Sequence, residues 1–266
     1  MVDASAWLTP AARTAYVVGC AAMVHAGERM WPRVASVPEG RRRVVNLAHW
    51  ALVVAVNLAL VPLAFALLAW AEARHVGLAR WLSLGPGSVA FVAVIGLDFV
   101  AWSLHVGLHK APVLWRLHRV HHNDRLVDVT TALRQHPIET TLRVAASVIG
   151  AALLGLPEWA LGLHVAVSGG HAAFEHGNLR LPAGLDRWIR RVLVTPDMHR
   201  VHHSRRVDET DSNYANVFAF WDRLGGTYRA SPDPARIPIG LDGLDDAVSQ
   251  TLPGLMALPF RATRTR

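Results

Sequence analysis

The sequence predicts an all-α integral membrane protein with about four membrane-embedded helices and a histidine-rich helical cap on the cytosolic side. Of the 266 residues, 52% are hydrophobic, and the mean hydropathy of +0.25 is high for a soluble domain. The apolar residues are concentrated in long stretches without charge, which is typical of membrane helices. Most of the 15 histidines lie in polar segments that follow these stretches or at their edges.

Two stretches are long enough to cross a bilayer, which takes about 20 mostly apolar residues. Val44–Ala71 contains no Asp, Glu, Lys or Arg, and Trp81–His109 contains only Asp98. The shorter uncharged segment Thr14–Ala26 is expected to embed in the membrane or to cross it. It lacks the basic start and the cleavage site of a signal peptide, so we interpret it as part of the mature chain.

A fourth apolar block, residues 144–170, is interrupted near Gly155-Leu156-Pro157. Each half is short for a span, so we expect a helical hairpin that dips into the membrane, or two short tilted helices. The predicted organisation is a lead-in at 1–43 with a potential membrane helix, a membrane domain at 44–230 and a tail at 231–266. The tail is rich in Pro, Gly and Asp and is expected to wrap the surface or to be partly loose.

The chain is basic, with a net charge of +7 and a pI of about 10.8. In a soluble protein this would suggest nucleic acid as a partner. Here Arg41–Arg43 precede the first long span, and a second basic cluster from Lys110 follows the other. Two crossings place both clusters on one side, which the positive-inside rule makes cytoplasmic, so no nucleic acid is predicted. Cys20 is the only cysteine, which excludes internal disulfides and multi-thiolate metal sites.

Three sets of histidines have spacings that place their members on one face of a helix. One is HVGLH, and two read HRVHH, together comprising His105, His109, His118, His121, His122, His199, His202 and His203. Neutral imidazoles arranged in this way are ligands for iron, zinc, copper or nickel. Eight ligands exceed what one ion binds, so we predict two neighbouring ions. The spacing does not name the metal.

Further residues are predicted to complete or orient these shells. Asp98 lies seven residues before His105 on the same helical face, and we expect its carboxylate to accept a hydrogen bond from a ligand imidazole. The alternative is a charge that reaches water. The segments RQHPIE and GGHAAFEHGN supply four more candidates, which are His136, His171, His176 and Asn178. Asp98, His136 and Asn178 are the predicted catalytic residues outside the ligand set.

These motifs resemble the fatty acid hydroxylase/sterol desaturase superfamily of integral-membrane di-metal oxygenases, which have three histidine boxes. The boxes here are HVGLH, HRVHH and HRVHH, and the flanking sequences are similar as well. They are LWRLHRVHH, RQHP, EHGNLRLP, TPDMHRVHH and NYANVFAFWDRLGGTY. The resemblance extends from about Arg41 to Tyr228.

The resemblance implies metal ligands at the eight box histidines and His176, with His171 and His136 in or beside the shells. It implies two iron ions, with zinc as a substitute, O2 as co-substrate, and hydroxylation or desaturation of a lipid. No G-x-G-x-x-G or Walker motif occurs, so electrons are expected from a cytochrome b5-like protein, a ferredoxin or a reductase. A basic face is expected to dock that partner or lipid headgroups, and comprises Arg116, Arg119, Arg200, Arg205 and Arg206.

Two other functions stay open at this point. One is a non-catalytic membrane protein that binds or transports metal, although transporters place their ligands near the midplane on broken helices. The other is a b-type haem carrier, which needs two axial histidines on facing helices and makes little use of adjacent His-His pairs.

Overall fold

The structure is a computed structural model that describes residues 9–35, 40–244 and 246–262. Within these ranges it has no β-strand, only three isolated bridges, which confirms the all-α prediction. The six long helices are α1 Pro10–Met30, α2 Gly40–Leu58, α3 Val61–Ala73, α5 Pro86–Lys110, α7 Pro137–Leu154 and α8 Glu158–Glu175. The shorter elements are α4 Leu78–Trp81, α6 Pro112–His122, η2 Val129–Leu133, α9 Ala183–Ile189, α10 Pro196–His202, α11 Val207–Thr210, α12 Phe220–Leu224, η3 Pro234–Arg236, α13 Leu252–Ala257 and η4 Leu258–Phe260.

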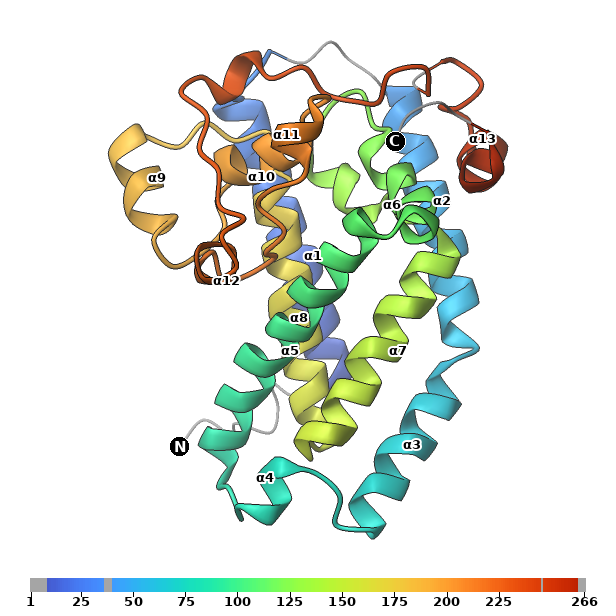
Figure 1. Ribbon diagram of the computed structural model, residues 1–266, viewed down its shortest axis with the longest axis vertical. Helices are drawn as coiled ribbons and strands as arrows, with labels where there is room; N and C mark the ends of the chain where they lie inside the picture. Colours follow the sequence, from blue (N-terminus) through green and yellow to red (C-terminus); the bar gives the residue numbers. More distant parts are fainter. Residues whose placement is uncertain (1–8, 36–39, 245, 263–266) are drawn as a thin grey trace.

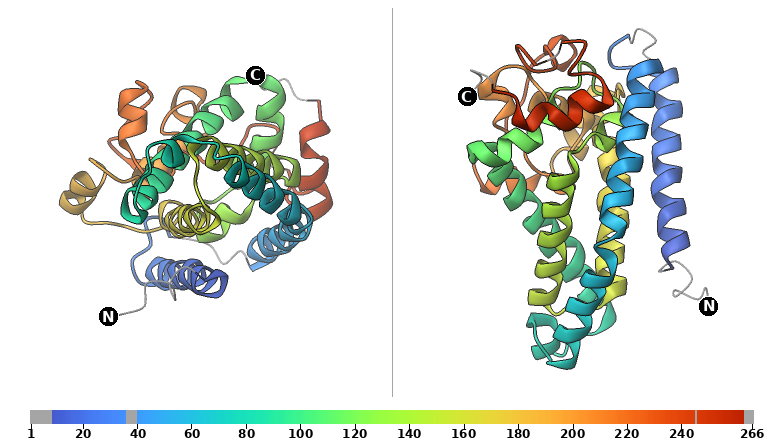
Figure 2. Two further views of the ribbon diagram at one scale, coloured as in Figure 1. Left: turned by 90° about the horizontal axis from the view of Figure 1, so that it is seen from below. Right: turned by 90° about the vertical axis from the view of Figure 1, so that its right-hand side faces the viewer.

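The long helices form a bundle, and most of the short ones form a cap at one end of it (Figures 1 and 2). α5 packs between α7 and α8, while α1 runs along the outer side of α8. α6, α10, α11 and α13 lie in the cap, at the end where α5 finishes and α7 begins (Figure 1). This arrangement brings both histidine-rich polar segments to the same end of the bundle.

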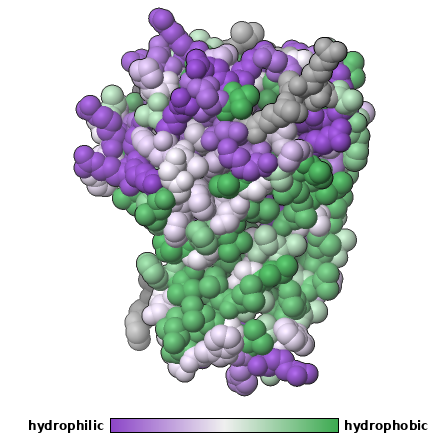
Figure 3. Space-filling model, viewed as in Figure 1, coloured by the Kyte–Doolittle hydropathy of each residue, from purple (hydrophilic) through white to green (hydrophobic). Residues whose placement is uncertain are grey.

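The surface of the bundle is apolar and the cap is polar. In Figure 3 hydrophobic residues cover the bundle, and hydrophilic residues gather over the cap and at the opposite tip. In the described part of the chain, α5 and α7 are long and apolar enough to cross a membrane. α2 and the following segment Val61–Trp81, bent by 46°, would form a third span. These helices indicate a membrane protein. They supply two or three candidate spans, and the expected number of about four membrane-embedded helices stays a prediction.

The expectation that each half of the 144–170 block is too short to span is wrong for α7. This helix begins at Pro137, because Pro is favourable at the first helical position and His136 Nδ1 accepts a hydrogen bond from Ile138 N. It ends at Gly155, in the left-handed region with φ +72°. Gly155 packs on Gly77, where an added Cβ would lie 2.2 Å from Gly155 N, so both glycines are required for this close approach.

The cap is fastened to the bundle by buried polar contacts at the start of α2. Arg42 Nη1 donates to Asp124 Oδ2 at 2.6 Å, and its Nη2 pairs with Asp128. Asn46 Nδ2 donates to the same Asp124 oxygen and to Thr130 Oγ1. These contacts fix the segment between α6 and α7, and with it the orientation of the second histidine box.

The described part of the tail wraps the cap and is not loose. Four of its leucines pack on Trp115 and Val120 of α6, namely Leu241, Leu244, Leu255 and Leu258. Arg119 Nη2 donates to the carbonyls of Leu258 and Arg261 at 2.6 and 2.7 Å. The predicted domain boundaries stay predictions, and residues 1–8 and 36–39 of the lead-in lie outside the described residues, as do 245 and 263–266 of the tail.

Candidate metal centre

Three helices carry the box histidines into the cap. α5 ends with His105 and His109, and the extended residue Ala111 lets α6 start in a new direction with Pro112 at its first position. α10 starts in the same way at Pro196, where Thr195 Oγ1 accepts a hydrogen bond from Met198 N. The two proline-initiated helices are short, so their histidine faces are set by packing and not by helix propensity.

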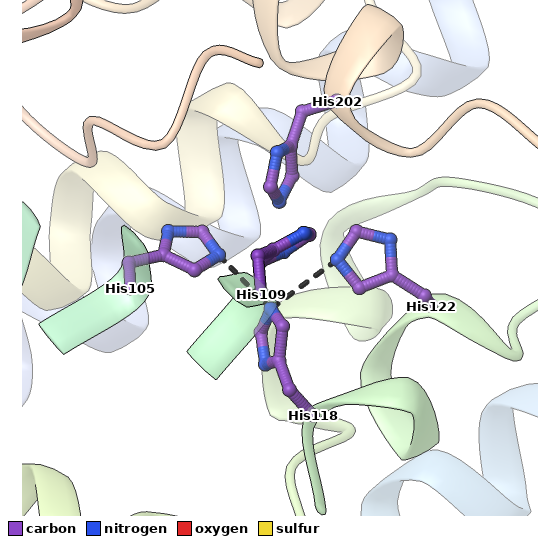
Figure 4. A group of neighbouring side chains, drawn as sticks. All are labelled: His105, His109, His118, His122 and His202. Carbon is purple, nitrogen blue, oxygen red and sulfur yellow. Dashed lines mark hydrogen bonds between the residues drawn. The ribbon is translucent and has the colours of Figure 1, made fainter. Parts of the chain in front are cut away.

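Among the described residues, nine buried histidines form two groups. The first group is His105, His109, His118, His122 and His202 (Figure 4). The second group is His121, His176, His199 and His203. Within each group the potential ligand nitrogens all lie within 4.8 Å of one another. Each HRVHH pentad contributes to both groups, so histidines 81 residues apart in the chain meet at one place in the cap.

In the first group the imidazole nitrogens converge on one point. His118 Nε2 lies 2.9 Å from Nε2 of His105 and 3.2 Å from Nε2 of His122, as Figure 4 shows with dashed lines. Two nitrogens that bind one ion at about 2.1 Å, at right angles to each other, are about 3.0 Å apart. The observed separations therefore fit cis ligands of a single ion.

The second group converges in the same way. His176 Nε2 lies 3.0 Å from Nε2 of both His121 and His199. Nε2 of His203 lies 3.1 Å from that of His199. The two groups adjoin, because the rings of His122 and His203 stack across them with centroids 4.6 Å apart.

The tautomers in the first group leave two imidazole lone pairs facing each other. His105 Nδ1 lies 2.7 Å from the Tyr214 carbonyl oxygen, and His118 Nδ1 lies 2.8 Å from Glu139 Oε1. A carbonyl and a carboxylate only accept, so both Nδ1 atoms carry the hydrogen and both Nε2 atoms carry a lone pair. Burial lowers the pKa of His118, although Glu139 opposes this, and the lowered pKa favours the neutral ring. Two lone pairs 2.9 Å apart repel each other, and an ion between them removes the repulsion.

The pKa values of six other cap histidines are lowered as well. Burial lowers the pKa of His202 to about 3 and that of His176 to about 4. Burial, followed by the charges of neighbouring histidines, holds four further pKa values well below their usual range, those of His121, His122, His199 and His203. Neutral imidazole is the form that binds metal ions.

One five-residue segment, 210–214, orients four of the five rings of the first group. Its four contacts join Thr210 Oγ1 to His122 Nδ1 (3.4 Å), Asp211 Oδ1 to His109 Nδ1 (3.3 Å), the Ser212 carbonyl to His202 Nδ1 (2.7 Å) and the Tyr214 carbonyl to His105 Nδ1 (2.7 Å). Glu139 orients the fifth ring. Such partners fix ring orientation and tautomer, and they raise the affinity of the ligand for metal.

The second group has fewer such partners. His176 Nδ1 donates to the Ala172 carbonyl at 2.8 Å. Nδ1 of His121, His199 and His203 has no hydrogen-bond partner among the described residues. The nearest carboxylate is Glu175, whose oxygens lie 3.6 Å from Nδ1 of His176 and 3.8 Å from Nδ1 of His199. The two groups thus differ in both ligand number and orientation.

A cavity of about 420 Å³ extends from the histidine groups into the bundle. Histidines of both groups line it, and they are His105, His118, His121, His176 and His199. Apolar side chains of α5, α7 and α8 line much of the remainder, including Val100, Leu104, Ala146 and Val165. An apolar chain inside this cavity would therefore lie beside both proposed ions.

Residues 90–227, more than half of the chain, match the family model described as fatty acid hydroxylase. The chain belongs to the fatty acid hydroxylase family. The matched segment contains all nine grouped histidines, Glu139 and the segment 210–214. This finding confirms the resemblance noted from the histidine boxes.

The relatives of this fatty acid hydroxylase family member carry the names of enzymes that act on lipids. The chain is 32% identical to ornithine lipid hydroxylase OlsE of Rhizobium tropici over 65% of its own length and 51% of the relative's. It is 30% identical to human alkylglycerol monooxygenase, over 53% of its own length and 30% of the relative's. It is 27% identical to mouse lathosterol oxidase, over 56% of its own length and 47% of the relative's. The chain thus spans about half or less of the length of these relatives. No solved structure matches it.

His171 and His136 lie outside both groups of this fatty acid hydroxylase family member. His171 Nε2 lies 3.0 Å from the Val194 carbonyl, so it bonds to the backbone beside the site. His136 caps α7 through Nδ1. The structure therefore gives both histidines roles in packing the chain around the centre.

Asp98 does not orient a ligand imidazole, as was expected, but contacts the chain at 217–221. Its carboxylate accepts hydrogen bonds from Val217 N, Phe218 N and Trp221 Nε1 at 3.1–3.2 Å, and not from a ligand imidazole. It holds the chain directly after the segment 210–214. Asn178 also has a structural role, because its side chain pairs with both N and O of Val34 and so ties the end of α8 to the chain after α1.

The expected basic docking face is wrong for two of its five arginines. Arg119 and Arg200 are buried and donate to backbone carbonyls, Arg119 to Leu258 and Arg261 and Arg200 to Pro234. They hold the tail on the cap. Arg205 also anchors the tail, through Asp242 and the Ile239 carbonyl.

Sequence reasoning missed Glu139 and Asp222. Glu139 stands in the RQHPIE segment three residues after His136, and its side chain is fully buried. Asp222 accepts hydrogen bonds from Tyr214 N and Ala215 N, both at 2.9 Å, so it fixes the carbonyl that orients His105. The carboxylate within the WDR motif was the available signal for Asp222.

Proposed function

We propose that this protein is a membrane-bound di-iron oxygenase that hydroxylates or desaturates a lipid with O2 and externally supplied electrons. The observation that carries the proposal is the pair of buried imidazole groups that converge beside an apolar-walled cavity. Imidazole shells suit iron, zinc and copper alike. The relatives named hydroxylase, monooxygenase and oxidase favour a redox-active metal, and therefore iron, with zinc as a substitute.

The nine grouped histidines would hold the two ions, five at one and four at the other. Bound there, iron would supply the oxidising power needed to remove hydrogen from an unactivated C–H bond. The segment 210–214 and Glu139 keep the rings of the first group in their ligand orientation. Apolar residues such as Leu104 and Val165 exclude water from the cavity and position the lipid chain against the site.

We place the site on the cytosolic side, because the two basic clusters of the sequence, Arg41–Arg43 and the one from Lys110 onward, flank the spans at the cap end. An electron donor has to approach the cap, where both groups lie. A cytochrome b5-like protein, a ferredoxin or a reductase would meet this need, since the sequence carries no nucleotide-binding motif of its own.

The test combines metal analysis with product analysis of purified protein in detergent or lipid discs. Wild-type protein is expected to bind about two iron ions per chain and to incorporate oxygen from 18O2 into a lipid, or to desaturate it, when reductant is supplied. His121→Ala and His202→Ala, one from each group, should each lose metal and product while still inserting into the membrane. His75→Asn is the matched control, because His75 is exposed and its backbone (φ +51°) is one that Asn tolerates.

Full activity in either ligand variant would refute the shared site. A wild-type protein that binds both ions but oxidises no lipid extract under reducing, aerobic conditions would instead be a metal-binding or transport protein.

A further inference from the structure

Arg143 is a charged residue on α7, one of the two helices suited to cross a membrane. It lies six residues after Pro137, about 9 Å along the helix from the cap end. Its side chain is 24% exposed, and it lines the cavity beside the histidine groups. An ionisable residue in a membrane helix is costly and usually marks a functional site.

Only part of its guanidinium group is used within the protein. Arg143 Nε donates to Glu139 Oε1 at 2.8 Å. The same oxygen accepts from His118 Nδ1, also at 2.8 Å. Neither Nη nitrogen of Arg143 has an acceptor among the residues that the structure describes. Up to four N–H groups of a permanent cation therefore lack a protein partner.

The free edge of this guanidinium has the shape that anionic oxygen groups require. With Nε held by Glu139, Nη1 and Nη2 form the remaining pair of parallel donors, which matches the two oxygens of a carboxylate or a phosphate. Among the described residues that line the cavity, Glu175 is the one carboxyl group; its oxygens lie 3.6 Å from Nδ1 of His176 and 3.8 Å from Nδ1 of His199, and it forms no ion pair with Arg143. Ser147, one turn further along α7, adds a hydroxyl to the same cavity wall.

We propose that Arg143 binds an anionic oxygen group, a carboxylate or a phosphate, in the headgroup of the lipid substrate. That the bound lipid is a substrate rests on the proposed function. Arg143 contacts Glu139, which contacts His118, so the bound headgroup lies about one side chain away from the first histidine group. The reacting C–H bond is consequently near the headgroup, and the far end of the acyl chain lies deeper between α5, α7 and α8.

The test measures binding and does not require turnover. Metal-loaded full-length protein in a neutral detergent is titrated under nitrogen with three radiolabelled probes of equal chain length, hexadecanoate, hexadecyl phosphate and hexadecanol, in a scintillation proximity assay. Wild-type protein is expected to bind an anionic probe roughly tenfold or more tightly than hexadecanol. Whichever of the two anionic probes binds with the lower dissociation constant shows whether the site prefers a carboxylate or a phosphate headgroup.

Arg143→Gln should reduce this preference to about one. Arg190→Gln is the matched control, because Arg190 also pairs with an acid four residues earlier, Asp186, but lies outside the cavity, so it should keep the preference. Arg143→Lys retains a cation beside Glu139 and loses the paired donors, so we expect its preference to fall at least threefold. If the Gln variant has a lowered unfolding midpoint or a lowered metal content, the anion preference of Arg143→Lys is the result that tests the proposal.

A wild-type protein without preference for either anionic probe would overturn the inference. So would an unchanged preference in the folded Arg143→Gln variant or, where that variant is unstable, in Arg143→Lys. The two proposals fail separately. Anion preference that depends on Arg143 in a protein without oxygenase activity would overturn only the proposed function. Oxygenase activity with an Arg143-independent preference would overturn only this inference.

Discussion

Glu139 is the residue whose replacement tests most directly how the first histidine group is held. Its Oε1 accepts from His118 Nδ1 and from Arg143 Nε, both at 2.8 Å, and the side chain has no solvent exposure. Glu139→Gln conserves the shape of the side chain and removes its charge. The amide oxygen has two lone pairs and can still accept from both donors, but both hydrogen bonds lose their charge, and the new NH2 group takes the place of Oε2, which has no hydrogen-bond partner in the described part of the chain.

The expected magnitude follows from these two contacts. A hydrogen bond to a charged group contributes about 1.5–3 kcal/mol, and breaking a fully buried ion pair costs about 3–5 kcal/mol. Arg143 has access to the cavity, which reduces the second cost, so we expect the free energy of unfolding to fall by about 2–3 kcal/mol. Loss of a partner that orients a metal-bound histidine typically lowers metal affinity by about 10–100-fold.

The assay is metal competition against a chelator of known affinity, together with the thermal unfolding midpoint. Glu139→Gln should release the metal of the first group at a lower chelator concentration than wild type. Glu158→Gln is the control, because Glu158 is also near the start of a long helix and pairs with Arg13 at 3.0 Å, but it is half exposed and lies at the opposite end of α8 from His176. Unchanged metal affinity in the Glu139→Gln variant would refute the role assigned to this carboxylate.

Three further predictions follow from the contacts of the site. His171→Ala should retain both metals, since His171 bonds to the Val194 carbonyl, whereas His176→Ala should lose the metal of the second group; elemental analysis of the two purified variants compares them. Asp98→Asn should lower the free energy of unfolding by about 1–3 kcal/mol, and with it the thermal unfolding midpoint, because the carboxylate accepts three hydrogen bonds. The carboxylate contacts no grouped histidine, so metal content should not change. A midpoint equal to that of wild type would contradict this prediction. A chelator should remove metal from wild-type protein in two phases of about equal amplitude.

The long helices could be predicted from the sequence because an uncharged apolar stretch has few alternatives to a membrane helix. The start of α7 was misplaced by seven residues, since His136-Pro137 was interpreted as a candidate ligand beside a polar segment and not as a cap followed by proline. The cap helices α9 to α12 have four to seven residues. Helices this short are stabilised by tertiary contacts, and a local pattern does not define them.

The histidine spacing predicted which side chains face one another but not how they divide between the two groups. That division depends on how α6 and α10 meet across the cap, which local sequence does not encode. The orienting partners were less predictable still. Tyr214 is 109 residues from His105, and it acts through a backbone carbonyl, which has no sequence signature.

Asp98 illustrates the limit of reasoning from a helical face. It does share a face with His105, but seven residues separate the two Cα atoms by about 10 Å along the axis, which is beyond hydrogen-bond reach. The chain at 217–221 returns to this point instead and brings two backbone N–H groups and the indole of Trp221 to the carboxylate. The charge of Asp98 in a membrane helix therefore predicted correctly that it has polar partners, but it did not predict which residues they are.

The unequal support of the two groups is the reason to expect two phases of metal release. Every ring of the first group has a partner at Nδ1, whereas three of the four rings of the second group have none in the described part of the chain. Rings without a partner lose more rotational freedom on binding, and the second group also has one ligand fewer. Its ion should therefore leave first. His203→Ala should abolish the fast phase and His109→Ala the slow one, and a single phase in wild-type protein would show that the contacts at Nδ1 do not control how tightly the two ions are held.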